Sequence, residues 1–326
     1  MTYAFDPELA PLVELLPPGD LSDVAAARAG INALVGPLNA NVDTTGIDVT
    51  DQDVPTEAGT VPVRVYTPTG PPPPGGRPAL LDIHGGGFVL GSIEIEHAFA
   101  TQLARELGVV VVAPEYRLAP EYPFPAGLED CYAALRWLHE GAAHLGVDVD
   151  RVGVGGQSAG GGLAAATALL ARDRGGPALC FQFLGIPELD HRLETASMRA
   201  FVDTPLWNRA NAELSWQYYL GVDTAAVSPY ASPAIAPDLH GLPPAYVTTM
   251  EFDPLRDEGI RFALRLLEAG VSVELHSFPG TFHGSMMVTT AAVSRRAHTE
   301  LVDALRRGLG ANRSSPNDSP EIRQDR

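Results

Sequence analysis

Short apolar runs rich in β-branched residues alternate with amphipathic helical patterns between Val61 and Phe278. Alternation of this kind is typical of a mainly parallel, twisted sheet with helices on both faces, so the pattern predicts an α/β fold. The predicted strands are VPVRVY from Val61, ALLDI from Ala79, VVVVA from Val109, RVGVG from Arg151, ALCFQFLGI from Ala178, AYVTTM from Ala245 and VELHSF from Val273.

Two regions lie outside the alternation and predict a cap on this sheet. Residues 1–45 look helical, and residues 187–228 are dense in aromatic side chains. We interpret them as two cap segments on a core domain formed by residues 46–186 and 229–310. The polar, proline-bearing tail of residues 311–326 has nothing to bury, so we expect it to be disordered.

The composition is typical of a globular protein, and the net charge argues against some classes of binding partner. The 326 residues are 45% hydrophobic and carry a net charge of −18. Such a charge repels phosphate backbones and anionic lipid, so neither nucleic acid nor a membrane surface is expected as a partner. Solubility is the plain explanation, although a salt-adapted host or the steering of a neutral or cationic substrate stays open.

Cysteines and apolar segments suggest neither metal chemistry nor a membrane. Cys131 falls in a predicted helix and Cys180 in a predicted buried strand, which favours free core thiols over a disulfide framework or a metal site. The first residues lack a basic stretch followed by an apolar run, and no segment reaches the roughly 18 apolar residues of a membrane span. We therefore expect a cytoplasmic protein.

The segment RVGVGGQSAGGGLAAATALL places GQSAG between a buried strand and an alanine-rich helix. In that context Ser158 is expected on a sharp strand-to-helix turn, where small residues let strand and helix approach closely. The helix N-terminus behind it favours developing negative charge. The alternative is a glycine-rich turn whose serine only caps the helix.

An earlier segment, LLDIHGGGFVLGS, supplies glycines just after a predicted strand. Backbone N–H groups of a loop such as His84 to Gly87 can stabilise a tetrahedral oxyanion, and a loop of this type accompanies the serine turn described above. The residue after the serine, Ala159, would supply a further N–H group. A tight loop without any ligand is the alternative interpretation.

A nucleophilic serine needs a base and an acid that orients the base, and in this fold they follow the serine in the order acid, then histidine. Asp253 comes just after one predicted strand and His283 just after the next. Asp253 is followed by Pro254, so it could instead serve only as a helix cap. Glu251 and Asp257 are poorer candidates, because one falls on the strand and the other inside the helix.

These motifs together resemble the hormone-sensitive-lipase-like family of bacterial esterases with the α/β-hydrolase fold. The resemblance rests on HGGGF, EYRLAPEYPFPAGLED, GQSAGG, EFDPLRDEG and TFHG and extends from about Val61 to Leu309. It implies Ser158 as nucleophile, His283 as general base and Asp253 as its orienting acid. It further implies an oxyanion hole formed by the N–H groups of Gly86, Gly87 and Ala159, an N-terminal helical cap completed by an internal segment, and a possible homodimer.

The sequence departs from the family at two positions where similar members carry Asp, namely Gln157 and Glu115. Neither residue takes part in the expected chemistry, but the departures leave open the subfamily and the charge network behind the glycine loop. We interpret Glu115, Tyr116 and Arg117 as structural residues that hold that loop.

The expected reaction is hydrolysis of short- to medium-chain acyl esters through an acyl-enzyme, without metal or cofactor and with a small-molecule ester as substrate. An amidase or acyltransferase would use the same residues, and a small-molecule-binding homologue without activity is a second alternative. Candidate pocket residues, which could equally be plain packing, are Phe88, Leu206, Trp207, Phe282, Met286 and Met287.

Overall fold

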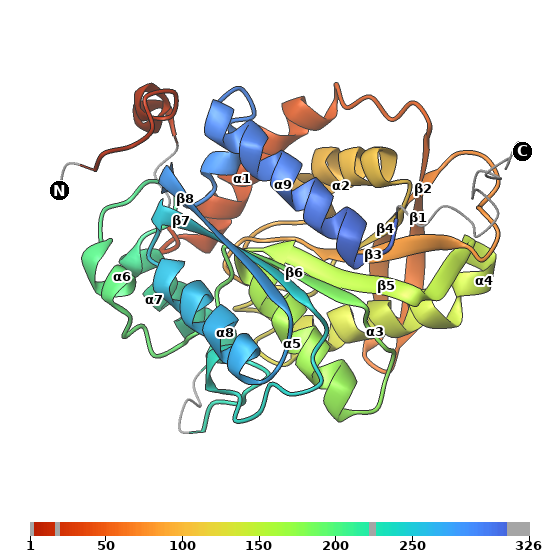
Figure 1. Cartoon of the computed structure of the whole chain (residues 1–326). Coiled ribbons are helices and arrows are strands. Elements are labelled where there is room, and N and C mark those ends of the chain that lie inside the picture. Colours follow the sequence, from red (N-terminus) through yellow and green to blue (C-terminus); the bar gives the residue numbers. More distant parts are fainter. Residues whose placement is uncertain (1–2, 17–19, 222–225, 312–326) are drawn as a thin grey trace, which may run out of the picture.

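The computed structural model describes residues 3–16, 20–221 and 226–311, and within them eight strands form one sheet in the order β1-β2-β4-β3-β5-β6-β7-β8 (Figure 1). All neighbours from β4 to β8 pair in parallel, whereas β2 runs antiparallel to both β1 and β4. The expected mainly parallel sheet is confirmed. The strands are β1 (Ile47–Thr56), β2 (Gly59–Pro68), β3 (Arg77–Ile83), β4 (Val110–Pro114), β5 (Val147–Gln157), β6 (Phe181–Gly185), β7 (Ala245–Phe252) and β8 (Val273–Phe282).

Strand β1 is the one that the apolar pattern missed. It forms a long antiparallel hairpin with β2, from the Ile47–Pro68 pair to the Thr56–Gly59 pair. Most of its residues are exposed, because it lies at the edge of the sheet with no neighbour on its other side. An edge strand of this kind carries polar residues on both faces, which hides it from a search for buried runs.

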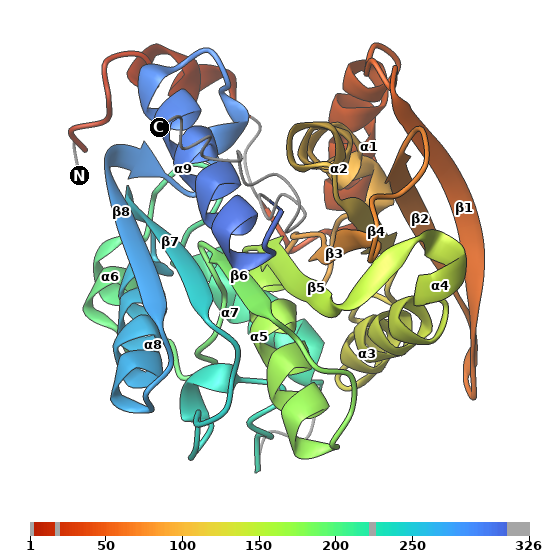
Figure 2. The ribbon, with the colours of Figure 1, turned by 45° about the vertical axis from the view of Figure 1, so that its right-hand side comes forward.

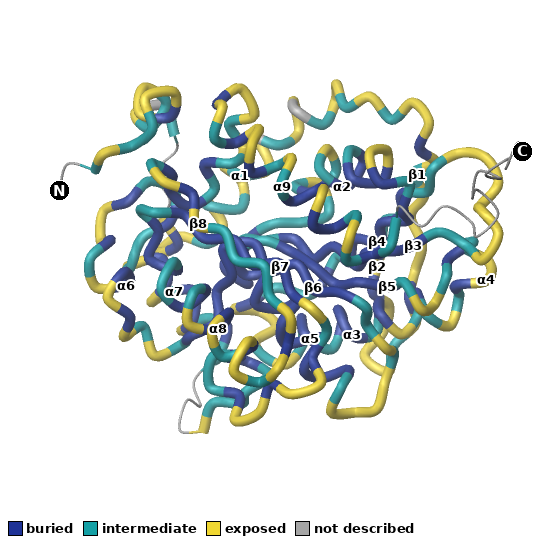
Figure 3. Tube along the Cα trace, viewed as in Figure 1, coloured by how far each residue is buried: buried dark blue, intermediate teal, exposed yellow. Residues whose placement is uncertain are grey.

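Helices cover both faces of the sheet (Figures 1 and 2). On one face lie α3 (Ala126–Glu140), α5 (Ala159–Asp173) and α8 (Arg256–Glu268), and on the other lie α2 (Ile93–Leu107) and α9 (Ala292–Gly308). The central strands between these layers are buried, as Figure 3 shows. The short helix α4 (Ala142–Leu145) follows α3 after a break at Gly141, and two single 3₁₀ turns complete the core, Pro233–Ile235 and Ser285–Met287.

The two regions outside the alternating pattern meet in space. The first contains a 3₁₀ turn (Ala10–Leu15) and α1 (Val24–Asn39), and the second contains α6 (Ala196–Ala200) and α7 (Arg209–Leu220). Leu21 packs with Trp207 and Ala212 of the second region. The Leu21 carbonyl accepts a hydrogen bond from the Tyr218 hydroxyl at 3.3 Å.

The chain's first described residues reach a different part of the core. The Asp6 N–H donates to the Gly280 carbonyl at 2.8 Å, and the Phe5 ring lies edge-on to Phe282, with ring centres 5.2 Å apart. The expectation of a disordered tail concerns residues that lie, from 312 onward, outside the described part. No helix among the described residues is long and apolar enough to span a bilayer.

Candidate active site

Four loops converge at the carboxyl edge of the parallel strands. The loop after β3 begins at His84, β5 ends immediately before Ser158, Asp253 follows β7 and His283 follows β8. Ligands of open α/β sheets bind at this edge, because the loops there can reach a common point while the strands hold their bases rigidly. All the motifs singled out in the sequence therefore share one end of the sheet.

Ser158 stands at a sharp turn between β5 and α5 with φ 57° and ψ −124°. A positive φ is uncommon for a residue with a β-carbon and marks stored backbone strain. The turn is held from both sides: the Ser158 N–H donates to the Gly185 carbonyl at 2.8 Å, and the Ser158 carbonyl accepts from Gly162 and Glu188, each at 3.0 Å.

Two glycines allow this turn to form. A β-carbon at Gly156 would lie 2.3 Å from the Ile83 carbonyl oxygen, and one at Gly160 would lie 2.0 Å from the same atom. Real β-carbons do not approach a backbone oxygen so closely. The glycines on either side of Ser158 therefore let strand β5, strand β3 and helix α5 meet.

Ser158, His283 and Asp253 form one hydrogen-bonded chain. His283 Nε2 lies 3.0 Å from Ser158 Oγ, and His283 Nδ1 lies 2.8 Å from Asp253 Oδ2. Because a carboxylate oxygen only accepts, Nδ1 carries the imidazole proton and Nε2 is left to accept the serine proton. The side chains are buried but not sealed, with Ser158 and His283 each 7% exposed.

The two oxygens of Asp253 have different partners, and the N-cap of α8 is Leu255 rather than Asp253. Its Oδ1 accepts the Leu255 N–H at 2.9 Å, just before α8 begins, while Oδ2 faces His283. The neighbouring acids are engaged elsewhere: Glu251 accepts the Gly280 N–H at 2.7 Å, and Asp257 accepts the Ser197 N–H at 2.8 Å.

The glycine loop lies directly beside Ser158. Gly86 and Gly87 have φ values of 121° and 58°, and a β-carbon at Gly85 would lie 3.5 Å from the Ser158 β-carbon. Within the described residues, the N–H groups of Gly86, Gly87 and Ala159 donate to no acceptor. Unpaired N–H groups beside a nucleophilic serine are what the stabilisation of an oxyanion requires.

Residues behind the glycine loop hold it in place. The Tyr116 ring stacks on His84 at 4.1 Å, and its hydroxyl donates to the His84 carbonyl at 3.0 Å. Burial lowers the pKa of His84 to about 4, so the ring is neutral at ordinary pH. Arg117 forms a paired contact with Asp130, and Glu115 accepts the Ile93 N–H at 2.7 Å. These contacts agree with the interpretation of Glu115, Tyr116 and Arg117 as structural residues.

Trp207 and Leu206 are the candidate pocket residues that lie beside the triad. The Trp207 and His283 rings are 5.7 Å apart, and a β-carbon at Gly87 would lie 2.4 Å from the Trp207 ring. Leu206 approaches Gly284, where an added β-carbon would lie 3.2 Å from its Cδ1. The indole of Trp207 therefore borders the space between the glycine loop and the histidine.

The other four candidates have different surroundings. Phe88 stacks on Tyr219 at 4.0 Å, Phe282 packs with Leu9, and Met286 packs against Met250 and its neighbours. The side chain of Met287 is 64% exposed, and its Cε lies 3.5 Å from where a β-carbon on Gly284 would be, close to Leu206. Phe88, Phe282 and Met286 thus pack in the core, whereas Met287 lies next to the residue that follows His283.

Glu188 is a site residue that sequence reasoning missed. It follows β6 at the same sheet edge, it is fully buried, and its Oε1 lies 3.0 Å from the Ser215 hydroxyl of α7. That hydroxyl also lies 2.9 Å from the Gly87 carbonyl. Burial, reinforced by the charge of Asp253, raises the pKa of Glu188 to about 8. An acid immediately after a buried strand was the available signal, but no motif marked it.

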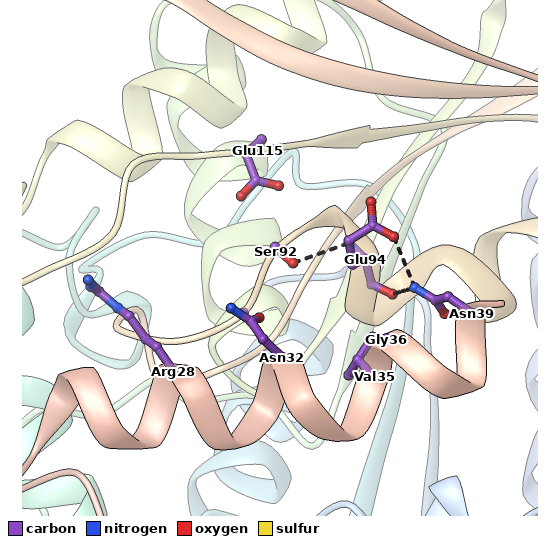
Figure 4. Close-up of a pocket in the computed structure, with 9 residues that line it drawn as sticks. Arg28, Asn32, Val35, Gly36, Asn39, Ser92, Glu94 and Glu115 are labelled. Carbon is purple, nitrogen blue, oxygen red and sulfur yellow. Dashed lines mark hydrogen bonds between the residues drawn. The ribbon is translucent and has the colours of Figure 1, made fainter.

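A separate cavity of about 450 Å³ lies beyond the glycine loop, between α1 and the start of α2 (Figure 4). Arg28 and Asn32 line it from α1, and Ser92 and Glu115 line it from the opposite side, where Glu115 faces the helix. The Asn39 amide closes one end by donating to Glu94. No cluster of His, Cys, Asp or Glu suited to a metal ion occurs in the described ranges.

Comparisons with known proteins agree with this geometry. Residues 80–287 match a family described by the alpha/beta hydrolase fold. The chain is 38% identical to the carboxylic ester hydrolase LipN of Mycobacterium tuberculosis over 296 residues, which cover 88% of this chain and 77% of LipN. It is 42% identical to the carboxylesterase NlhH of the same species over 260 residues, covering 77% of this chain and 79% of NlhH.

A solved structure extends the likeness to the whole fold. A bacterial heroin esterase superposes with a TM-score of 0.91 at 54% identity, covering 94% of this chain and 98% of that one. The expected family and fold are confirmed by these matches.

Proposed function

The chain belongs to the hormone-sensitive-lipase-like family of bacterial esterases and is a carboxylic ester hydrolase, and on that premise we propose that Ser158, His283 and Asp253 are its catalytic triad. The observation that carries the proposal is the continuous hydrogen-bond chain from Ser158 Oγ through the imidazole to Asp253. Strain at Ser158 and the position of the glycine loop support the same assignment.

The proposed mechanism has two halves. His283 Nε2 takes the proton as Ser158 Oγ attacks the ester carbonyl, and the protonated imidazole then gives it to the departing alcohol. Water hydrolyses the acyl-enzyme by the same steps. The N–H groups of Gly86, Gly87 and Ala159 stabilise the oxyanion in both halves, and Asp253 keeps the imidazole proton on Nδ1.

The mechanism is tested with phenyl acetate and the variants Ser158→Ala and His283→Ala. Each variant is expected to lose at least about 10³-fold in kcat while its melting temperature stays close to that of the wild type. Ser228→Ala, which alters a hydroxyl whose bond among the described residues is to the local Tyr230 N–H, serves as the control. Undiminished turnover by Ser158→Ala would overturn the assignment. The matched anilide, acetanilide, separates ester hydrolysis from amidase activity.

We further propose that the pocket takes short acyl chains, with Trp207 as the residue that limits their length. The indole borders both the glycine loop and His283, and a ring of this size beside the serine would restrict the length of a bound acyl chain. Trp207→Ala is expected to shift the preferred p-nitrophenyl ester from acetate or butyrate toward longer chains. The 54% sequence identity to a bacterial heroin esterase supports heroin as one further substrate to test.

A homodimer and a cytoplasmic location remain part of this proposal. Strand β8 lies last in the sheet order, and Leu264 and Leu267 on the adjacent α8 are 51% and 50% exposed. An edge strand beside exposed leucines supports contact with a second copy. Light scattering of the purified protein tests the dimer, and cell fractionation tests the location.

A further inference from the structure

The hydrogen bonds around Ser215 contain one proton too few if Glu188 is ionised. The Ser215 hydroxyl lies within hydrogen-bond distance of two acceptors, the Gly87 carbonyl at 2.9 Å and Glu188 Oε1 at 3.0 Å. A hydroxyl donates one proton only, and a carbonyl cannot donate. Both contacts are therefore hydrogen bonds only when Glu188 supplies a proton of its own.

The surroundings of Glu188 favour its neutral form for an independent reason. The side chain is fully buried, and its second oxygen, Oε2, contacts no donor among the described residues. A buried carboxylate with one oxygen unpaired is costly, whereas a carboxylic acid tolerates it. Within the described residues, the titratable groups that act on Glu188 are two acids and a phenol: Asp253 after β7, and Glu258 on α8 and Tyr219 on α7, whose pKa values burial raises.

Glu188 also contacts the two other parts of the site. Its N–H donates to the Ser158 carbonyl at 3.0 Å. Its own carbonyl oxygen packs so closely on α5 that a β-carbon on Gly162 would lie 2.1 Å from it. One residue thus touches the nucleophile turn, the helix behind it and, through Ser215, the glycine loop. No other contact ties α7 of the cap to Gly87 in this way within the described chain.

We propose that neutral Glu188 and Ser215 are positioning residues that fix the oxyanion loop through a directed chain, in which the Glu188 O–H donates to Ser215 Oγ and the Ser215 O–H donates to the Gly87 carbonyl. When Glu188 loses its proton, its carboxylate and the Gly87 carbonyl compete for the single Ser215 proton. Gly87 then loses its bond to Ser215, and its N–H group moves away from the position of the oxyanion. The inference rests on the proposed roles of Ser158 and the glycine loop.

The proposal predicts an alkaline loss of kcat that belongs to Glu188. The wild-type kcat for phenyl acetate, followed by proton release in a pH-stat, is expected to fall about tenfold between pH 7.5 and 9.5, with KM changing less than twofold. A displaced oxyanion donor accounts for a fall of this order, since complete removal costs about 10²- to 10³-fold. The midpoint is expected near the Glu188 pKa of about 8.

Three variants test it. Glu188→Gln keeps a neutral donor at every pH and is expected to match the wild type at pH 7.5 while losing less than twofold by pH 9.5. Ser215→Ala removes the link itself, so kcat at pH 7.5 is expected to fall to about the level that the wild type reaches at pH 9.5, and the alkaline loss disappears. Glu258→Gln, a buried acid that binds the Leu189 and Asp190 N–H groups and not the loop, is the matched control and keeps the wild-type profile.

A flat wild-type profile, or a wild-type alkaline loss in Glu188→Gln, would overturn the proposal. If Glu188→Gln does not fold, Ser215→Ala tests the proposal instead. An alkaline loss of kcat that persists without the Ser215 hydroxyl would contradict the proposed hydrogen-bond chain just as clearly. Ser158→Ala is measured in the same series. Activity in that variant would overturn the proposed triad, so failure of the triad and failure of the Glu188 proposal can be told apart.

Discussion

At the scale of single residues, the two carboxylate oxygens of Asp253 accept hydrogen bonds from different partners. Oδ2 orients His283, and Oδ1 accepts the Leu255 N–H ahead of α8. One buried side chain thus contacts both the proposed catalytic histidine and the backbone that precedes α8. The two contacts are separable, because each uses a different oxygen of the carboxylate.

Asp253→Asn is expected to keep the helix contact and lose the reaction. The amide oxygen can still accept from Leu255, but the amide nitrogen now faces Nδ1 and favours the wrong imidazole tautomer. We expect kcat to fall by about 10³- to 10⁴-fold with a small change in melting temperature. Asp257→Asn, whose carboxylate binds Ser197 and Arg256, is the control and should retain most activity. Full activity in Asp253→Asn would move the orienting acid elsewhere.

At the level of residues, the sequence was most informative where a motif fixes a position relative to a strand end. Ser158 and the glycine loop follow strands that periodicity already predicts, and the structure shows His283 within reach of Ser158. Phe282, next to that histidine, points into a cluster with Leu9 instead. Neighbours in sequence alternate sides, so proximity to a motif residue does not place a side chain in the same pocket. Glu188 escaped because its role depends on a partner in another segment, Ser215.

At the scale of elements, the glycine loop is held from helix α1 as well as from the sheet. Arg28 on α1 donates through Nε to the Val89 carbonyl and through Nη2 to the Ala119 carbonyl, each at 2.9 Å. It also forms an ion pair with Glu121 at 2.8 Å. The first two bonds tie α1 to the backbone that follows the glycine loop and to the segment after β4.

Arg28→Ala is expected to lower the free energy of unfolding by about 1–2 kcal/mol, because two partly buried carbonyls lose their donor. Glu121→Ala removes only the ion pair, whose acid side chain is 53% exposed, and should cost less than about 0.5 kcal/mol. Urea denaturation followed by tryptophan fluorescence measures both. Equal losses in the two variants would show that the ion pair, and not the backbone contacts, holds α1.

Element-level prediction was good for the buried strands and poor at the edge. The parallel strands were visible because burial on both faces demands continuous apolar runs. The first strand, IDVTDQDVPT, has exposed positions on both faces, so its pairing with β2 comes from backbone hydrogen bonds that leave little trace in side-chain pattern. The predicted strand from Ala178 begins later, at Phe181.

At the scale of the whole molecule, the protein buries several acids while carrying a net charge of −18. Asp82, Glu96, Glu188 and Glu258 are all buried, and burial is the largest cause that raises the pKa of each. An acid whose pKa is higher in the folded chain binds its proton more tightly there than after unfolding. Its contribution to stability is complete below its unfolded pKa and is lost as pH rises through the folded value.

Stability is therefore expected to decrease from pH 5.5 to pH 8.5, by at least about 2 kcal/mol, because one unit of pKa shift corresponds to about 1.4 kcal/mol. Self-repulsion of the net negative charge acts in the same direction. Urea denaturation across this range measures the change, and Glu188→Gln should flatten it. A free energy of unfolding that rises with pH would contradict the buried neutral acids.

The packing of Leu21 with the second cap segment has a consequence for synthesis on the ribosome. The Tyr218 hydroxyl binds the Leu21 carbonyl across a separation of 197 residues, and contacts so distant in sequence form late because a long loop must close first. Helix α1 leaves the exit tunnel early with its partner surface still untranslated. The apolar side of the nascent helix therefore stays accessible to chaperones until the segment that contains Tyr218 has emerged.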